Sequence, residues 1–199
     1  HGYTPAAGLQ AVRAAMAGYL SGTFRTQYRA EDIFMTSGAC AALAIVCAAL
    51  IGPGEEAVTL TPYFSEYRVY VEAAGGRLRE ARSDPETFQI DLAAVEAQLS
   101  PRTALVILNS PNNPSGVVLR RDGLAALAAL LTKKAAEYGH PIYILADEPY
   151  RDLVYGGVEV PFIPDLYPDT IYCTSFSKSL SLAGERVGYL AVAEQTAEH

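Results

Sequence analysis

Apolar and polar positions alternate along this chain in blocks that predict helices and strands in turn. Residues 9–20 carry apolar side chains at helical spacing, and Gly22 follows them as an expected stop. Residues 39–51 are apolar on almost every face and are followed by a Gly-Pro-Gly break. The first block predicts an amphipathic helix, and the second predicts a helix that is buried on all sides.

The remaining blocks continue this alternation. Short apolar runs that predict strands lie at residues 57–61, 104–108, 142–146, 170–173 and 187–192. Further helices are predicted at residues 66–74 and 123–138. Apolar strands that alternate with helices predict an α/β fold, in which helices cover both faces of a mostly parallel sheet. Because no linker-like or low-complexity segment interrupts the pattern, we expect residues 1–199 to form one domain.

Composition and charge narrow the classes of function. Half of the 199 residues are hydrophobic, 19% are charged, and the formal net charge is −7, which is typical of a globular protein. A nucleic-acid binder would need a basic stripe, and the sequence has none. No apolar run is long enough for a membrane span, and no signal peptide is recognisable. We therefore expect a cytoplasmic protein that binds neither nucleic acid nor membrane.

The three cysteines do not form a recognisable site. Cys40, Cys47 and Cys173 make no CxxC pair and no cluster with histidine. They are therefore interpreted as reduced thiols, and no metal site is expected.

A lysine with unusual neighbours follows the strand predicted at residues 170–173. Lys178 comes directly after Ser175 and Ser177, and Arg186 follows it eight residues later. A lysine at the end of a buried strand is expensive to desolvate unless its amine is paired or used covalently. Hydroxyl groups and a guanidinium are suitable ligands for a phosphate. This pattern favours a Schiff-base lysine beside pyridoxal phosphate, although a solvated loop lysine is the alternative for this segment alone.

The run at residues 142–146 ends in an acidic residue that fits the same chemistry. Asp147 lies at the carboxyl end of the predicted strand, where a carboxylate is poorly solvated and needs a cationic partner. The protonated ring nitrogen of the cofactor would be such a partner. Tyr150 can offer its hydroxyl to the ring oxygen of the cofactor. Considered alone, Asp147 could instead cap the next turn, and Tyr150 could pack in the core.

Three further segments carry candidate binding groups. Asn113 lies in a turn between two prolines, which makes its amide a fixed hydrogen-bond donor. Ser37 is a suitable N-cap for the buried helix, and Gly38 allows an anion to approach the free N–H groups there. Phe64 follows a predicted strand and could stack on a flat ring. An ordinary turn, a plain capped helix and a core aromatic remain the alternatives for these segments.

Taken in order, these segments resemble the class I/II, fold-type-I aminotransferases that depend on pyridoxal phosphate, the aspartate aminotransferase group. The matching segments are His1-Gly2-Tyr3-Thr4-Pro5 with Gly8, Ser37-Gly38-Ala39, Pro62-Tyr63-Phe64, Asn113-Pro114-Ser115-Gly116, Asp147-Glu148-Pro149-Tyr150, Ser175-Phe176-Ser177-Lys178 and Arg186. The resemblance implies a three-layer α/β sandwich with pyridoxal 5′-phosphate as cofactor. It also implies an amino acid and a 2-oxo acid as substrates.

The resemblance implies a role for each matched residue. Lys178 would form the internal aldimine and shuttle a proton at the substrate Cα, and Asp147 would pair with the ring nitrogen. Asn113 and Tyr150 would hydrogen-bond the ring oxygen, and Phe64 would stack on the ring. The phosphate would be held beside Gly38 by the amides of Ala39 and Cys40 and by Ser175, Ser177 and Arg186. Tyr3 would reach the phosphate of a neighbouring subunit, which implies a homodimer.

The chain departs from the family pattern in two respects. Ala39 and Cys40 stand where many members have polar residues, so only backbone donors are left there. Family members are also about twice as long. We therefore expect a large domain alone, without the N-terminal arm or the small domain whose arginine binds the substrate carboxylate, and with weak activity. A lyase or racemase on the same fold, or a non-catalytic sensor of pyridoxal phosphate, remain alternatives.

Overall fold

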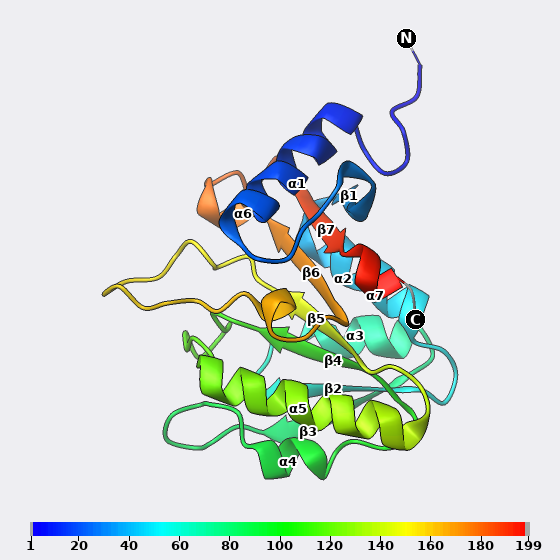
Figure 1. Ribbon diagram of the computed structural model, residues 1–199, viewed down its shortest axis with the longest axis vertical. Helices are drawn as coiled ribbons and strands as arrows, with labels where there is room; N and C mark the ends of the chain where they lie inside the picture. Colours follow the sequence, from blue (N-terminus) through cyan, green and yellow to red (C-terminus); the bar gives the residue numbers. More distant parts are fainter. Residues whose placement is uncertain (1, 198–199) are drawn as a thin grey trace.

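One seven-stranded sheet lies between two layers of helices in the computed structural model, which describes residues 2–197 (Figure 1). His1, part of the first matching segment, and His199 lie outside the described residues. The strands are β1 (Ile33–Thr36), β2 (Glu56–Thr61), β3 (Arg77–Arg82), β4 (Thr103–Asn109), β5 (Tyr143–Asp147), β6 (Thr170–Ser175) and β7 (Gly188–Val192). Their order is β1-β7-β6-β5-β4-β2-β3, and β7 runs antiparallel to both of its neighbours. The expected α/β fold with a mostly parallel sheet is confirmed.

Helices cover both faces of this sheet. The helices are α1 (Gln10–Thr23), α2 (Gly38–Leu50), α3 (Glu66–Ala73), α4 (Leu92–Glu96), α5 (Arg121–Tyr138), α6 (Phe176–Ser179) and α7 (Glu194–Ala197). Two short 3₁₀ turns, η1 (Ala30–Asp32) and η2 (Ile163–Asp165), complete the described elements. Helices α1 and α5 pack on one face of the sheet and α2 and α3 on the other, as Figure 1 shows.

The apolar blocks predicted these elements well, with several differences. Every predicted strand is present, and β5 and β6 continue into the polar residues Asp147 and Ser175. Helix α1 continues through Gly22, so the predicted stop is wrong, because the helix ends only where the Phe24 N–H bonds the Leu20 carbonyl. Ser37 does precede α2, but its hydroxyl makes no capping hydrogen bond. Strands β1 and β3 and helix α4 were not predicted.

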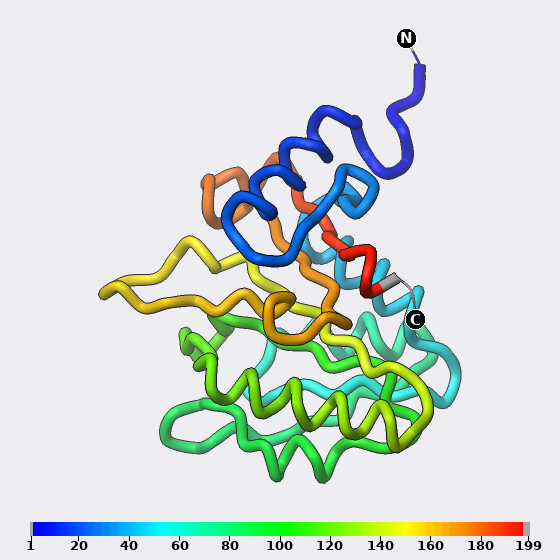
Figure 2. Tube along the Cα trace, in the orientation of Figure 1, coloured from blue at the N-terminus to red at the C-terminus, as the bar shows by residue number. Residues whose placement is uncertain are grey.

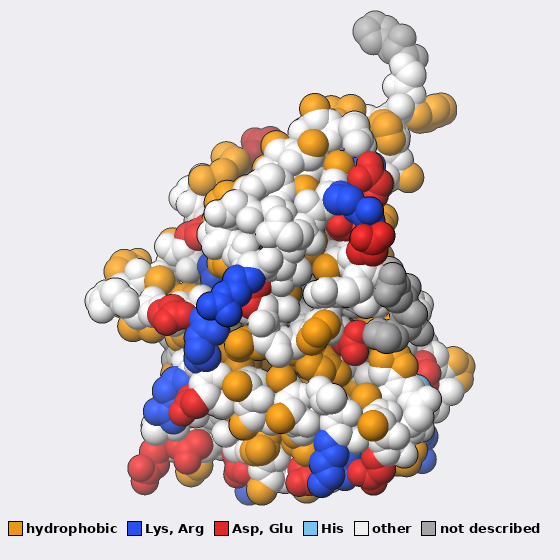
Figure 3. Space-filling model, viewed as in Figure 1, with side chains coloured by type: hydrophobic (Ala, Val, Ile, Leu, Met, Phe, Trp, Pro, Cys, Tyr) orange, Lys and Arg blue, Asp and Glu red, His pale blue; other side chains and the backbone are white. Residues whose placement is uncertain are grey.

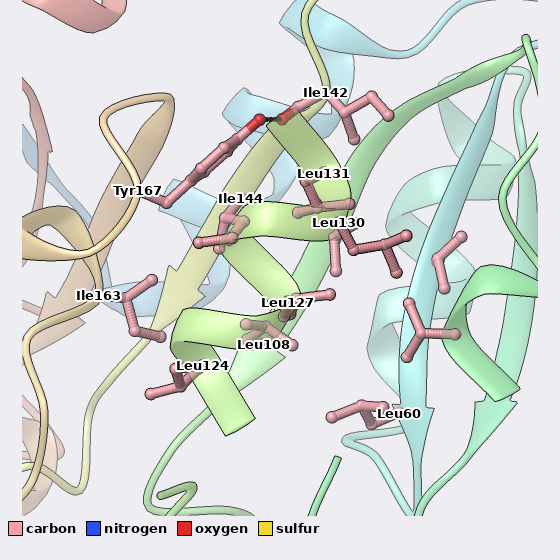
Figure 4. Close-up of a cluster of buried hydrophobic side chains, with 14 of the residues drawn as sticks. Leu60, Leu108, Leu124, Leu127, Leu130, Leu131, Ile142, Ile144, Ile163 and Tyr167 are labelled. Atoms are coloured by element: carbon pink, nitrogen blue, oxygen red, sulfur yellow. Dashed lines mark hydrogen bonds between the residues drawn. The ribbon is translucent and has the colours of Figure 1, made fainter. Parts of the chain in front are cut away.

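A leucine-rich core holds α5 against the sheet. Leu127 and Leu131 of α5 are completely buried against Leu108 of β4 and Ile144 of β5 (Figure 4). The Tyr167 hydroxyl donates a 2.8 Å hydrogen bond to the Ile142 carbonyl at the border of this cluster. This core fixes the central strands relative to one another, and so it also fixes the groups at their ends.

The carboxyl ends of the parallel strands bring polar residues together. Asn109 at the end of β4 pairs in register with Asp147 at the end of β5, and Asp147 pairs with Cys173 of β6. In open parallel sheets this edge is where ligands bind. The fold therefore places the predicted polar residues at the expected edge.

Two segments project from the body of the molecule. The segment before α1 extends away from it, and the chain between β5 and η2 forms a long loop, yellow to orange in Figure 2. On the face shown in Figure 3, acidic and basic side chains are interspersed. None of the described helices is long and apolar enough to cross a membrane. Within residues 2–197, no group of three His, Cys, Asp or Glu side chains could hold a metal ion.

Candidate active site

A cavity of about 280 Å³ opens at the carboxyl ends of β4, β5 and β6. The predicted site residues that line it are Ala39, Cys40, Phe64, Asn113, Asp147, Tyr150, Ser175, Ser177, Lys178 and Arg186. Gly38 lies directly beside Arg186. Tyr3 is fully exposed and does not line the cavity. Residues that are distant in the sequence therefore converge on a single pocket.

Asp147 is held from two sides at the base of the cavity. It is only 4% exposed, and the Tyr67 hydroxyl of α3 donates a 2.6 Å hydrogen bond to its Oδ2. The Cys173 thiol lies 3.6 Å from Oδ1. Burial raises the pKa of the Asp147 carboxyl to about 6, and the hydrogen bonds from Tyr67 and Cys173 partly oppose this shift. The carboxylate bonds no backbone group of the next turn among the described residues, so the turn-cap alternative has no support here.

Lys178 lies at the mouth of the cavity, within the short helix α6. Lys178 is exposed, so its amine does not carry the cost of burial that the end of a buried strand would impose. Lys178 belongs to α6, none of whose residues is buried, whereas every residue of the preceding strand β6 is buried. Its Nζ lies 5.9 Å from the centroid of the Tyr150 ring, and no acidic group of the described chain forms an ion pair with it. The amine is therefore accessible at the pocket.

Tyr150 and Asn113 line the cavity together with Asp147. Asn113 hydrogen-bonds the half-buried Tyr150, which lowers the phenol pKa, while burial and the Asp147 charge raise it more. The Asn113 N–H also donates a 2.6 Å hydrogen bond to Asn109 Oδ1. Asn109 in turn donates from Nδ2 to the Asp147 carbonyl at 2.7 Å. Asn109 thus fixes the turn that carries Asn113 to the end of β5.

Arg186, which lines the cavity, lies directly against Gly38. Gly38 has a φ of +77°, and a Cβ built on it would lie 2.6 Å from Arg186 Nη2. Only glycine therefore leaves space for this guanidinium at the start of α2. Arg186 Nη1 also donates to Ser177 Oγ at 3.3 Å and to the Ala183 carbonyl at 3.2 Å. Together with the free N–H groups of the first turn of α2, this arrangement forms a cradle suited to an anion.

A buried ion pair supports the turn behind the site. Glu148 is 1% exposed and pairs with Arg151, whose guanidinium also donates to the Val160 and Pro161 carbonyls. Burial raises the pKa of the Glu148 carboxyl to about 7, although Arg151 opposes the shift. The guanidinium lies 5.0 Å from the Phe24 ring centroid. These contacts fix the chain that follows Asp147.

Three residues of this site were not identified from the sequence. Tyr67 lies in the first turn of α3, three residues after Phe64, and this closeness to a predicted site residue was a usable signal. Asn109 ends β4 where Asp147 ends β5, so its equivalent position was a usable signal. Cys173 was interpreted only as a reduced thiol in a strand, and nothing local marks it as a partner of Asp147.

Known proteins match the chain over its whole length. The family model described as aminotransferase class I and II matches residues 1–199. The aspartate aminotransferase of Thermotoga maritima is 33% identical over 98% of this chain and 51% of its own length. The methionine aminotransferase of Escherichia coli is 33% identical over 94% of this chain and 48% of its own.

Solved structures agree with this match. A crystal structure of an amino transferase from Eubacterium rectale is 49% identical, with a TM-score of 0.95 over 98% of this chain and 49% of its own. This chain spans about half the length of the curated relatives it matches. Members of the matched family use pyridoxal phosphate. From the fold, the strand-end cavity and these matches together, we conclude that the chain belongs to the class I and II aminotransferases.

Proposed function

We propose that this chain binds pyridoxal 5′-phosphate and serves an enzyme that transfers an amino group between an amino acid and a 2-oxo acid. One observation carries the proposal: the Lys178 amine, the Asp147 carboxylate and the Arg186 guanidinium line a single cavity. Because the chain spans about half of its relatives, the activity of the whole protein is part of the proposal.

The residues present fit this cofactor. The cradle of Gly38 and Arg186 suits a phosphate, since a Cβ at residue 38 would collide with the guanidinium. Asp147 is a buried carboxylate without a cationic partner among the described side chains, and a protonated ring nitrogen would provide one. When bound, pyridoxal phosphate supplies a carbonyl carbon that reacts with amines and a ring that withdraws electrons from the substrate.

Each site residue of the chain would have a separate role toward the bound cofactor. Lys178 Nζ would hold the cofactor covalently and afterwards move the proton at the substrate Cα. Asp147 would keep the ring nitrogen protonated, while Asn113 and Tyr150 would orient the ring through its oxygen. Phe64 would cover one face of the ring. The phosphate would be anchored by the amides of Ala39 and Cys40 together with Ser175, Ser177 and Arg186.

The proposal also includes that the protein forms a homodimer and works in the cytoplasm. Tyr3 is fully exposed, and Leu9, before α1, and Val12 and Tyr19 of α1 are exposed apolar side chains. A second copy would cover this surface and take up Tyr3 at its own phosphate. The free thiols of Cys40, Cys47 and Cys173 are consistent with a reducing compartment. Sedimentation of the cofactor-loaded chain measures the expected dimer.

The main experiment tests whether Lys178 binds the cofactor covalently. Pyridoxal phosphate added to the chain should produce a visible absorbance band that Lys178→Ala abolishes. Lys134→Ala is the matched control, because that amine pairs with Glu96 and Glu137 and does not line the cavity. Borohydride reduction and peptide mapping should identify Lys178 as the modified residue. A band that survives Lys178→Ala would refute the assignment.

Product analysis separates the related reactions. With an amino acid and 2-oxoglutarate, amino transfer gives a new 2-oxo acid and glutamate in equal amounts. Ammonia release would indicate a lyase, and inversion at the Cα without any 2-oxo acid would indicate a racemase. A bound cofactor without any turnover would favour the sensor alternative.

A further inference from the structure

Tyr67 lies outside every motif that marks the site, yet it contacts the central carboxylate directly. Its side chain is 1% exposed, and its ring is stacked on Tyr63 with centroids 6.2 Å apart and set edge-on to Phe64 at 5.7 Å. These two rings fix the direction of the Tyr67 hydroxyl. That hydroxyl donates to Asp147 Oδ2 at 2.6 Å.

Asp147 receives a second donor from β6. The Cys173 Sγ lies 3.6 Å from Oδ1, at the limit of a hydrogen bond from a thiol. Each carboxylate oxygen therefore has one donor from the protein. A carboxylate can accept about four hydrogen bonds in all, so lone pairs remain on both oxygens.

We propose that Tyr67 is a positioning residue: its hydroxyl keeps Asp147 ionised and fixes the edge of that carboxylate toward the cavity, with Cys173 as a weaker second donor. The proposal rests on the proposed function, since an ionised Asp147 matters only if a cationic ring nitrogen binds opposite it. Without donors, a carboxyl as buried as Asp147 takes up a proton and loses the charge that this partner requires.

Tyr67 and Cys173 act as hydrogen-bond donors to Asp147 because both keep their protons. Burial and the charge of Asp147 raise the pKa of the Tyr67 phenol far above its usual range, so the phenol keeps its proton. The same causes raise the pKa of the Cys173 thiol. Both groups therefore donate to Asp147 and never compete with it as anions.

Other titratable groups around Asp147 are arranged differently. Glu148 follows Asp147 directly after β5 and pairs with Arg151. Tyr150 and Tyr70 interact with the Asp147 charge without a hydrogen bond to it. Lys178 lies at the cavity mouth, and no basic side chain of the described chain forms an ion pair with Asp147. The Tyr67 hydroxyl is therefore the strongest donor that Asp147 has.

The test is made on the chain without cofactor. Tyr67→Phe removes one oxygen atom, and the pKa of Asp147 is followed by ¹³C NMR of protein labelled at aspartate carboxyls, with Asp147→Asn to assign the signal. We expect the Asp147 pKa to rise by about one to two pH units, the usual effect of a lost hydrogen bond to a charged group. Cys173→Ala should raise it less. An unchanged Asp147 pKa in Tyr67→Phe would overturn the proposal.

Two further measurements complete the design. Tyr63→Phe is the matched control, because the Tyr63 hydroxyl bonds Glu80 and not Asp147; the Asp147 pKa should stay unchanged. If Tyr67→Phe does not fold, the unmodified chain can still test the proposal. The ¹H chemical shift of its Tyr67 hydroxyl should change with pH at the pKa of Asp147, because the two groups share a hydrogen bond. A hydroxyl signal that is independent of that titration would also overturn the proposal. Neither measurement uses pyridoxal phosphate, so a missing visible band would refute the proposed function without affecting this result.

Discussion

Gly38→Ala should separate phosphate anchoring from the rest of cofactor binding. The added Cβ would lie 2.6 Å from Arg186 Nη2, and ordinary contact begins near 3.4 Å, so the guanidinium must retreat by roughly 0.8 Å. A side-chain end moves at little cost to the fold. At the anion cradle, however, this movement removes a charge-assisted hydrogen bond from the ligand.

The magnitude follows from two separate effects. Hydrogen bonds to charged groups contribute about 1.5–3 kcal/mol, so the Kd for pyridoxal phosphate should rise by about 10- to 100-fold. Alanine at a φ of +77° is also strained by about 1–2 kcal/mol, which lowers the free energy of unfolding whether or not ligand is present.

Two comparisons make this assay decisive. Pyridoxal, which lacks the phosphate, should bind Gly38→Ala and the parent chain with similar Kd, as measured by the visible band. Gly18→Ala is the control for added methyl groups, because nothing lies within 4 Å of that position inside α1. It should stabilise the chain by about 0.5–1 kcal/mol. Equal Kd values for pyridoxal phosphate in Gly38→Ala and the parent would refute the anchoring role of Arg186.

Three other changes test the core, the buried carboxylate and the extent of the chain. Leu127→Ala should lower the free energy of unfolding in urea by about 2–5 kcal/mol, and Val69→Ala, at an exposed position of α3, should change it little. The Asp147 carboxyl has its pKa raised from 3.8 to about 6, so its contribution to stability is present below pH 4 and lost as the pH rises through 6. Asp147→Asn should therefore stabilise the cofactor-free chain at pH 8 by up to about 3 kcal/mol and have little effect on its stability at pH 4. It should also abolish amino transfer. If the free energy of unfolding of Asp147→Asn and of the parent had the same dependence on pH, that result would contradict this. The chain should transaminate at least about 100-fold more slowly than the Thermotoga maritima enzyme, of which it spans 51%, and similar rates would show that it contains its own clamp for the substrate carboxylate.

Among the strands, the sequence predicted those whose side chains are buried on both faces. The run before Asp147 is β5, and its apolar residues could lie only in a central strand. Strand β3 was missed because it lies at the sheet edge and reads RLREAR, with only Leu78 and Ala81 buried. Strand β1 has four residues, too few to show a period.

The site was predictable where a motif follows the end of a strand, and less so where contacts cross between elements. Asp147, Lys178 and Arg186 line the same cavity as expected. The sequence left the exposure of Lys178 open, because the short helix α6 that carries it was not predicted. The hydrogen bond between Tyr67 and Asp147 joins α3 to β5. This contact depends on the order of the strands in the sheet, which neither segment predicts.

The place of β7 in the sheet has a consequence for biosynthesis. The sole partner of β1 in the described sheet is β7, and β7 is translated after all the other strands of that sheet. During synthesis on the ribosome, β1 therefore stays unpaired until residues 188–192 have emerged. The contact between Gly38 and Arg186 can also form only late in synthesis. Capture of the cofactor thus becomes possible only in a chain whose sheet is complete, and nascent or truncated copies that end before β7 should leave it free.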